Sequence, residues 1–287
     1  MSDHRLENRR LWDEWSDEFQ SYWNATTADG DLPPAPSPFD TDRPGGMAPD
    51  PLDSVAGTDY VELGCGGGQG SVGTARAGAD TVVGVDFSGE QLRHARRLRD
   101  FYGVDARFVQ GDVTDLPLPD GAFDLASSEA AFQMVPDLDR ALAEARRVLR
   151  DGGVFVLSLP HPLYEALDAE TRTLAGSYLD AGPREVTVDD GYESTLVLFD
   201  RTVAQVYNAL RDAGFEVNRM LEHVNDPVAE GDPSESDRPD VLWEIPGACG
   251  SERSRGRASG PRSEAASAYS PTSSSYCAPV CFSVAVE

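Results

Sequence analysis

The sequence of 287 residues predicts an α/β fold, in which helices cover both faces of a doubly wound parallel sheet. Short apolar segments alternate with amphipathic segments between positions 59 and 158, as in parallel strands joined by helices. The first apolar segment runs into the glycine-rich residues 64–70, and the second ends at the acid Asp86. A strand, a glycine turn, a helix and a second strand ending in an acid begin a nucleotide-binding β-α-β unit.

The strands and helices of this core are expected at definite places. Besides the helix after the glycine turn, three helices are predicted: from Ser88 to Gly103, over about 138–149 and over 202–213. Ser88 and Gln91 have the spacing of a capping box, and glycines after each helix predict its end. Short runs rich in Val, Leu and Phe predict strands at residues 61–63, 82–85, 107–109, 123–127, 154–159 and 215–221, with a further edge strand at 241–245.

The spacing of the glycines indicates which nucleotide the unit holds. The dinucleotide fingerprint G-x-G-x-x-G does not fit, because Gln69 or Ser71 occupies its sixth position in the two possible counts. The pattern E-x-G-x-G-x-G does fit, with Glu62, Gly64, Gly66 and Gly68. This pattern resembles motif I of the class I S-adenosylmethionine-dependent methyltransferases.

Further motifs extend the resemblance in the order that this family has. They are Asp86 and residues 111–113, 121–125 and 147–156. The chain is therefore similar to methyltransferases of type 11. The resemblance implies a Rossmann-like sheet with an antiparallel last strand, and it implies S-adenosylmethionine as the cofactor.

The resemblance also assigns residues to the methionyl end of the cofactor. Backbone groups of Gly64, Cys65, Gly66 and Gly68 would meet it, and Glu62 would hold the loop. The carbonyl groups of Ser127 and Ser128, at the end of the fourth strand, would accept from the methionyl ammonium group. We expect the Cys65 side chain to fill space in the loop.

The nucleoside end is assigned in the same way. Asp86 would accept from both ribose hydroxyls, and Phe87 would lie along the adenine. Asp112 would accept from the adenine amine, and the Val113 amide would meet a ring nitrogen. Two alternatives remain: Asp86 could be an acid at a helix entry, and Asp112 could cap the turn before Pro117.

The expected reaction is direct methyl displacement onto a small-molecule acceptor. Orientation supplies most of the catalysis, and a base is needed only if the acceptor carries a proton at neutral pH. The candidates are Glu129, after the fourth strand, and His161, after the fifth. His161 could equally be a turn residue between two prolines. Many relatives have a His near Gln133, where this chain has none.

A β-α-β unit of this kind also occurs in proteins with three other functions. An RNA or protein methyltransferase stays an alternative, although residues 127–130 do not form an N-P-P-Y-type sequence, which counts against amino-group methylation of bases. A nicotinamide-dependent oxidoreductase is disfavoured by the missing third glycine and by the absence of Lys. A non-catalytic nucleotide-binding protein stays open.

The charge of the chain is strongly negative. Fifty Asp and Glu oppose 24 basic residues, all of them Arg, which gives a net charge of −26. This balance is typical of halophile proteins, since concentrated salt screens self-repulsion, and it makes nucleic-acid binding unlikely because phosphates need a basic surface. Neither a membrane span, a signal peptide nor a metal site is expected, so the protein is expected in the cytoplasm. The oligomeric state stays open.

We expect three parts in the chain. Residues 1–50 contain a helix over 5–24 with an aromatic stripe, followed by a proline-rich connector. The helix could be a lid over the cofactor, or it could pack against the sheet. Residues 51–246 form the methyltransferase domain, with a substrate-side insertion at about 161–200.

Residues 247–287 differ in composition from the rest, because they contain no Asp and are rich in Ser, Ala and Gly. We expect this tail to be disordered or aberrant, so that the last strand is lost. The alternative is a flexible insertion followed by a true strand at 280–286.

Overall fold

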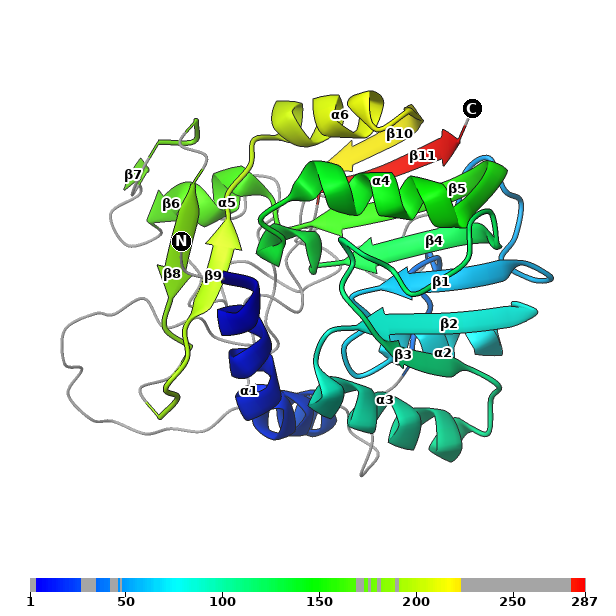
Figure 1. Cartoon of the computed structure of the whole chain (residues 1–287), viewed down its shortest axis with the longest axis horizontal. Coiled ribbons are helices and arrows are strands. Elements are labelled where there is room, and N and C mark those ends of the chain that lie inside the picture. The colour runs from blue at the N-terminus through cyan, green and yellow to red at the C-terminus, as the bar shows by residue number, and fades with distance from the viewer. Residues whose placement is uncertain are drawn as a thin grey trace, which may run out of the picture.

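The computed structural model describes residues 4–26, 35–41, 46, 48–168, 173–174, 177–179, 182–188, 191–222 and 280–286. A seven-stranded sheet forms its centre, with helices on both sides (Figure 1). The predicted fold class is therefore confirmed. The edge strand expected at 241–245 lies outside the described residues.

The strand order of the sheet is β10-β11-β5-β4-β1-β2-β3. The five strands β5, β4, β1, β2 and β3 run parallel to one another, whereas β11 pairs antiparallel with both β5 and β10. The order reverses where β1 lies beside β4, and a doubly wound sheet binds ligands at such a point. The strands are β1 (Asp59–Leu63), β2 (Thr81–Asp86), β3 (Arg107–Gln110), β4 (Phe123–Glu129), β5 (Leu149–Leu159), β10 (Phe215–Glu222) and β11 (Val280–Val286).

Strand residues alternate between two apolar cores, one on each face of the sheet. On β5, Phe155 packs in one core, while Val154 and Val156 pack in the other. Because both of its faces are buried, β5 is apolar from Val154 to Leu157. The helices of the central unit are α2 (Gln69–Arg76), α3 (Gly89–Tyr102), α4 (Leu138–Val148) and α6 (Val203–Asp212), and α4 and α6 pack on the Phe155 face.

The start of β5 differs from the prediction. The two glycines at 152 and 153 were expected to end a helix before a strand at 154, but β5 begins at Leu149 and includes them. Gly152 has φ +76°, and the pairing with β4 shifts register between Phe123 and Leu125. The glycines therefore form an irregularity inside the strand, because a left-handed backbone conformation favours glycine.

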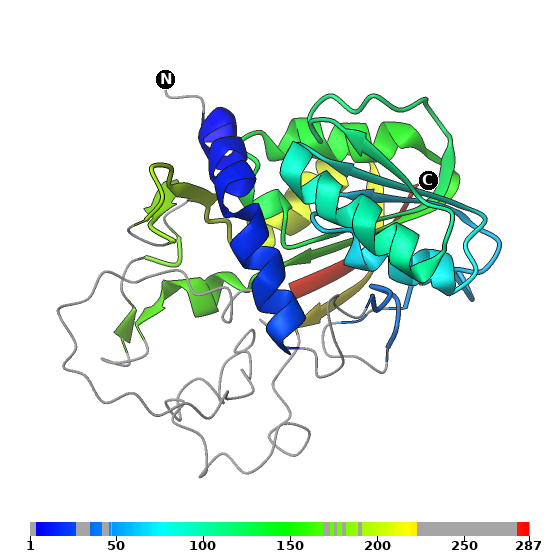
Figure 2. The ribbon, with the colours of Figure 1, turned by 90° about the horizontal axis from the view of Figure 1, so that it is seen from below.

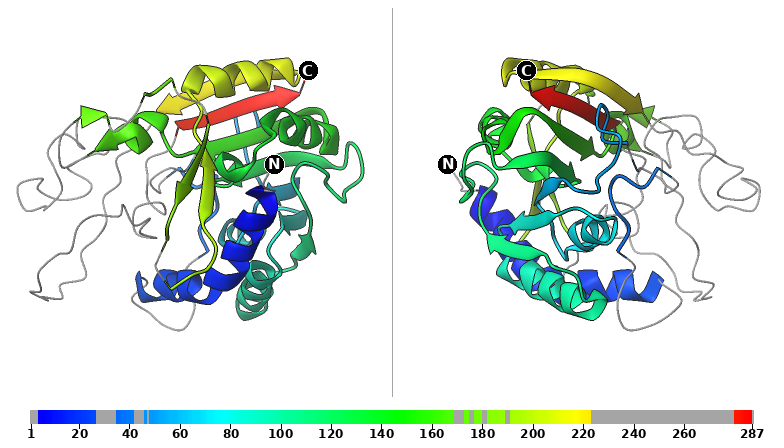
Figure 3. Two further views of the ribbon diagram at one scale, coloured as in Figure 1. Left: turned by 60° about the vertical axis from the view of Figure 1, so that its left-hand side comes forward. Right: turned by 90° about the vertical axis from the view of Figure 1, so that its right-hand side faces the viewer.

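The C-terminal strand is also a correction. Residues 280–286 form β11, which lies between β10 and β5 (Figure 3). Phe282 and Val284 are fully buried. The expectation that the antiparallel last strand is lost is wrong, because alternating apolar side chains face the core that α4 and α6 cover. Residues 247–279 lie outside the described residues.

The N-terminal helix α1 (His4–Thr26) lies across the edge of the central unit, between α3 and a small hairpin (Figure 2). Its buried side chains Leu11 and Trp15 pack on the hairpin strands β8 (Pro183–Val186) and β9 (Leu196–Phe199). The stripe thus packs against the hairpin rather than the central sheet. The remaining short elements are η1 (Phe132–Met134), α5 (Pro162–Ala166), β6 (Leu167–Asp168) and β7 (Thr173–Leu174).

Candidate functional site

The glycine-rich loop after β1 is held against β2 by backbone hydrogen bonds. The amides of Gly64 and Cys65 both donate to the Val85 carbonyl, at 2.8 and 3.0 Å. Gly64 and Gly68 have φ values of +78° and +80°. The loop thus turns sharply at the carboxyl edge of the sheet, where glycine accepts left-handed conformations without strain.

The three motif glycines have different surroundings. A Cβ at Gly64 would lie 2.4 Å from the Ala131 Cβ, and one at Gly68 would lie 2.8 Å from the Ala95 Cβ. A Cβ at Gly66 would meet nothing nearer than a Gln91 oxygen at 3.7 Å. Gly64 and Gly68 therefore allow close packing of the protein on itself, whereas Gly66 borders open space.

Asp86, the last residue of β2, connects the glycine-rich loop to the start of α3. Its Oδ2 accepts from the Gly66 amide at 2.8 Å, and its Oδ1 accepts from the Ser88 amide at 2.9 Å. The side chain is only 7% exposed. Burial raises the pKa of Asp86 to about 6, and the two amide hydrogen bonds oppose that rise.

Glu62 and Cys65 are buried beside the same loop. Ser71 on α2 donates to Glu62 Oε2 at 2.5 Å, so the carboxylate holds the first turn of the helix that follows the loop. Burial, assisted by the charges of Asp86 and Glu62, raises the pKa of the Cys65 thiol well above its ordinary value. A neutral, buried thiol fits the prediction that Cys65 fills space.

Of the predicted adenine-side residues, Phe87 follows β2, whereas Asp112 and Val113 follow β3. Asp112 Oδ1 accepts from the amide and the hydroxyl of Thr114, and its Oδ2 forms an ion pair with Arg5 at 2.8 Å. Burial acts against ionisation, yet the bonds from Thr114 and Arg5 together lower the pKa of Asp112. Phe87 accepts a bond from Gln110 at its carbonyl. Val113 is half-buried beside Asp112.

Ser127 and Ser128 are fully buried near the end of β4. The Ser127 hydroxyl is 2.6 Å from the Tyr60 hydroxyl, whereas Ser128 Oγ has no hydrogen-bond partner among the described atoms. The chain then turns at Ala130, which has φ +49°. A left-handed non-glycine residue costs roughly 1–2 kcal/mol, and such strain concentrates at functional sites.

The two candidate bases lie at the ends of neighbouring strands. Glu129 is half-buried at the end of β4. His161, after β5, is 4% exposed. Its Nδ1 accepts from the Leu163 amide at 3.2 Å, and its Nε2 is 2.8 Å from Glu222 Oε1. Since Nδ1 accepts, Nε2 carries the proton and donates to Glu222. Both ring nitrogens are therefore engaged by the protein.

The helix α1 contacts each predicted nucleotide-binding segment. Gln20 bonds to Gln69 and Gln91, and its side chain lies over Gly67. Asp13 accepts from the Ser88 hydroxyl at 2.7 Å. The sequence analysis missed these contacts. The aromatic stripe predicts the helix but gives no signal for where its polar face lies.

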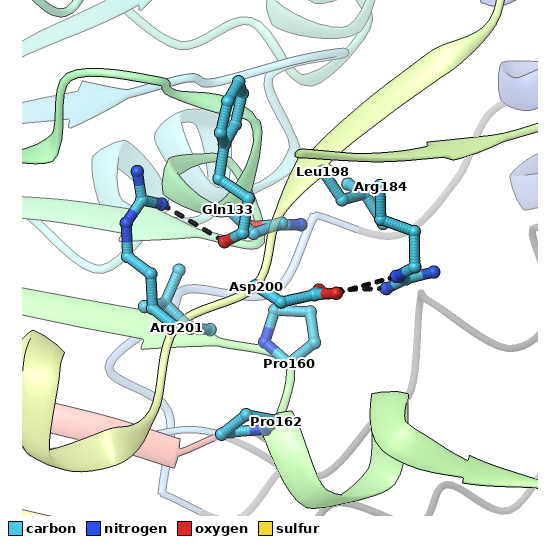
Figure 4. A pocket seen from close by; sticks show the side chains of 9 residues that line it. Gln133, Pro160, Pro162, Arg184, Leu198, Asp200 and Arg201 are labelled. Carbon is cyan, nitrogen blue, oxygen red and sulfur yellow. Dashed lines mark hydrogen bonds and ion pairs between the residues drawn. The ribbon is translucent and has the colours of Figure 1, made fainter. Parts of the chain in front are cut away.

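A pocket opens at the carboxyl end of β5, beside these segments (Figure 4). Leu159 and the prolines at 160 and 162 form its apolar side. Arg184 donates to both carboxylate oxygens of Asp200, at 2.8 and 3.1 Å. The remaining lining residues are Gln133, Leu198, Phe199 and Arg201. The sequence analysis placed a substrate-side insertion here but identified none of these polar residues.

Within the described ranges, His, Cys, Asp and Glu form no group of three or more that could hold a metal ion. None of the helices in the described part of the chain has the length and apolar character needed to cross a membrane.

The central unit is similar to known methyltransferases. Residues 61–157 match the family model of the methyltransferase domain named Methyltransf_11. The chain is 34% identical over 160 residues to the fatty-acid O-methyltransferase of Mycolicibacterium smegmatis, covering 54% of this chain and 57% of that protein. It is 42% identical over 88 residues to the demethylmenaquinone methyltransferase of Thermus thermophilus, covering 30% of this chain and 40% of that protein.

A solved structure extends the likeness beyond the central unit. The S-adenosylmethionine-dependent methyltransferase of Mesorhizobium loti superposes with a TM-score of 0.59 and is 27% identical. The alignment covers 82% of this chain and 93% of that one. The chain spans less than two thirds of the length of the two curated relatives. S-adenosylmethionine is the cofactor that this family and fold imply.

Proposed function

We propose that this chain, which carries a class I S-adenosylmethionine-dependent methyltransferase domain, transfers a methyl group to a small-molecule acceptor. The observation that carries the proposal is the 2.8 Å bond from the Gly66 amide to Asp86, beside open space at Gly66. Gly66 has no side chain that would exclude a ribose, and the buried carboxylate of Asp86 can accept hydrogen bonds from the ribose hydroxyls. The relatives named above for a fatty acid and for demethylmenaquinone support a small acceptor.

The residues present fit the cofactor at the methionyl end. The backbone of residues 64–68 would hold it, and the ammonium group would donate to the carbonyls of Ser127 and Ser128. Ser128 Oγ, buried without a partner among the described residues, is the kind of polar atom that a ligand satisfies. Glu62 keeps its assigned role of holding the loop, through Ser71.

The nucleoside end would use the acids after β2 and β3. Asp86 would accept from the ribose hydroxyls, and Phe87 would lie along the adenine. Asp112 would accept from the adenine amine, with the Val113 amide beside it. When bound, S-adenosylmethionine supplies an electrophilic methyl group on a sulfonium, which is a good leaving group.

The protein's part in the reaction is orientation and exclusion of water. We propose that α1 acts as the lid, since Arg5, Asp13 and Gln20 contact the three nucleotide-binding segments. A base is required only for an acceptor that is protonated at neutral pH. Glu129 and His161 stay the candidates. Before His161 could accept a proton from the acceptor, it would have to give up its hydrogen bond with Glu222 or with the Leu163 amide.

Two other functions stay alternatives. An RNA or protein methyltransferase would use the same domain, and a non-catalytic nucleotide-binding protein would bind the cofactor without transfer. The acidic surface argues against nucleic acid as a partner. We further propose a cytoplasmic location at high salt, because concentrated salt screens the repulsion within a chain of net charge −26.

The first test is calorimetric titration with S-adenosylmethionine in concentrated KCl, with NAD as the control ligand. Micromolar binding of S-adenosylmethionine alone supports the proposal. A folded sample that binds neither ligand, or that prefers NAD, refutes it. Incubating the bound chain with small acceptors and following S-adenosylhomocysteine release then separates transfer from binding alone.

A further inference from the structure

We propose that the pocket at the carboxyl end of β5 binds the carboxylate of an acidic methyl acceptor, with Arg201 as the residue that recognises it. The inference rests on the proposed function and names its substrate class. The pocket lies beside the predicted cofactor site, because Gln133, which lines it, donates to the Ala130 carbonyl at 2.7 Å. Ala130 directly follows Glu129 at the end of β4.

Arg201 is a cation held by neutral groups. Its two terminal nitrogens donate to the carbonyls of Phe132, Val135, Pro136 and Phe199, at 2.6 to 3.3 Å. Among the described residues, no carboxylate lies within ion-pair distance of it, and its Nε–H has no hydrogen-bond partner. Carbonyl oxygens orient a guanidinium but do not neutralise its charge.

The other cation of the pocket is already neutralised. Arg184 and Asp200 form a two-pronged ion pair, with both carboxylate oxygens engaged. Figure 4 shows the Arg184 and Arg201 side chains on opposite sides of the pocket, with Asp200 between them and its carboxylate turned toward Arg184. The two arginines and the single aspartate leave the lining with one positive charge, in a chain whose net charge is −26.

The positive charge of Arg201 is partly removed from water, and this desolvation disfavours the charged form. Burial lowers the pKa of Arg201, and the more distant carboxylates of Asp139, Asp137 and Asp200 only partly oppose that shift. Arginine nevertheless stays protonated in proteins. A desolvated cation without a counter-ion gains from a ligand anion, and one oxygen of a carboxylate can accept from the Nε–H, the donor that the four carbonyls leave open.

The rest of the lining indicates the body of the acceptor. Leu159, Leu198, Phe199 and the two prolines are apolar. Gln133 adds a buried Oε1 with no hydrogen-bond partner among the described atoms. An acceptor with one carboxylate on an apolar body would satisfy both the charge and the apolar side of the pocket. A cationic amine would be repelled.

The test uses matched acids and amides. Octanoate and phenylacetate, with octanamide and phenylacetamide as neutral counterparts, are titrated calorimetrically into the full chain with and without S-adenosylhomocysteine. The titration is run at the lowest salt at which the chain stays folded, because salt screens charge. The variants are Arg201→Gln, Arg201→Lys and, as the control, Arg107→Gln. Arg107 is an exposed arginine on β3, at the opposite edge of the sheet.

We expect the wild type to bind an acid at least tenfold more tightly than its amide, about 1.4 kcal/mol. Arg201→Gln should abolish this preference, Arg201→Lys should keep much of it, and Arg107→Gln should leave it unchanged. Equal binding of acid and amide, or no acid binding at all, overturns the inference. It is also overturned if Arg201→Gln and Arg201→Lys weaken acid and amide alike, since Arg201 would then only hold η1. If the folded wild-type chain does not bind S-adenosylhomocysteine, the proposed function is refuted instead.

Discussion

The Gly66 amide donates to Asp86 Oδ2 at 2.8 Å, so this hydrogen bond ties the loop after β1 to the end of β2. The carboxylate is buried, and its other oxygen also accepts a backbone amide. A ribose at this position would therefore meet an acceptor that is already oriented, which lowers the entropy cost of binding.

Asp86 should contribute directly to cofactor affinity. Asp86→Ala is expected to weaken S-adenosylmethionine binding by about 2–3 kcal/mol, the scale of a lost pair of charge-assisted hydrogen bonds. Calorimetry measures the change, and Asp124→Ala on β4 is the control. An affinity that stays at the wild-type value would remove Asp86 from the site.

Asp86 should also make stability depend on pH. Its pKa is raised from 3.8 to about 6 in the folded chain, so the stabilising protonated form is fully populated below about pH 4. That contribution is lost as the pH rises through about 6. We expect the Tm of the wild type to fall relative to that of Asp86→Asn across this interval and to level off above it. A constant Tm difference would contradict the burial-driven shift.

Substitutions of two motif glycines should affect different properties, cofactor binding at Gly66 and stability at Gly64. Gly66→Ala meets open space and should cost only roughly 1–2 kcal/mol for its left-handed φ of +50°, yet it should weaken S-adenosylmethionine binding at least tenfold, or about 1.4 kcal/mol. Gly64→Ala would bring a Cβ to 2.4 Å from the Ala131 Cβ, so its main effect should be a lower Tm. Thermal melting and calorimetry on both variants test this contrast. Equal losses of Tm would refute it.

The ion pair between Arg5 and Asp112 should moderate cofactor binding. Its side chains are 49% and 23% exposed, so the pair contributes at most about 1 kcal/mol to stability. Arg5→Ala frees one carboxylate oxygen for the adenine amine and should tighten binding by up to about fivefold, or 1 kcal/mol. Arg9→Ala, from the same helix, is the control. Weaker binding in Arg5→Ala alone would show that Arg5 assists the ligand instead.

The last strand should be essential for stability. Phe282 is fully buried between β5 and β10, so Phe282→Ala should cost about 3–5 kcal/mol. Met220→Ala, on the neighbouring β10, removes a side chain that is 44% exposed and should cost less than about 0.5 kcal/mol. Urea unfolding compares the two variants. A small effect of Phe282→Ala would mean that β11 is dispensable.

Local signals in the sequence predicted most of the central sheet. Ser88 does accept from the Gln91 amide as the expected N-cap. The Gln91 side chain, however, bonds to Gln20 instead of completing the capping box. The propensity for a cap is local, whereas the helix that takes the glutamine comes from a distant part of the chain.

Long-range pairs were not predictable from the sequence. Arg5 meets Asp112 over a separation of 107 positions, and 24 arginines face 50 acids, so composition cannot select one pair. The C-terminal strand was misjudged for a related reason. Its apolar alternation predicts a strand, but the change in composition before it indicates the opposite, and only the sheet shows where the strand belongs.

The position of β11 also bears on how the chain reaches its native state. Its two neighbours, β5 and β10, both precede it in the sequence and do not pair with each other. Until residues 280–286 arrive, each neighbour presents a row of unpaired N–H and C=O groups, a surface on which other chains can add strands. Insertion of a late segment between two earlier strands is slow. Self-association during synthesis or refolding should therefore begin at this gap in the sheet.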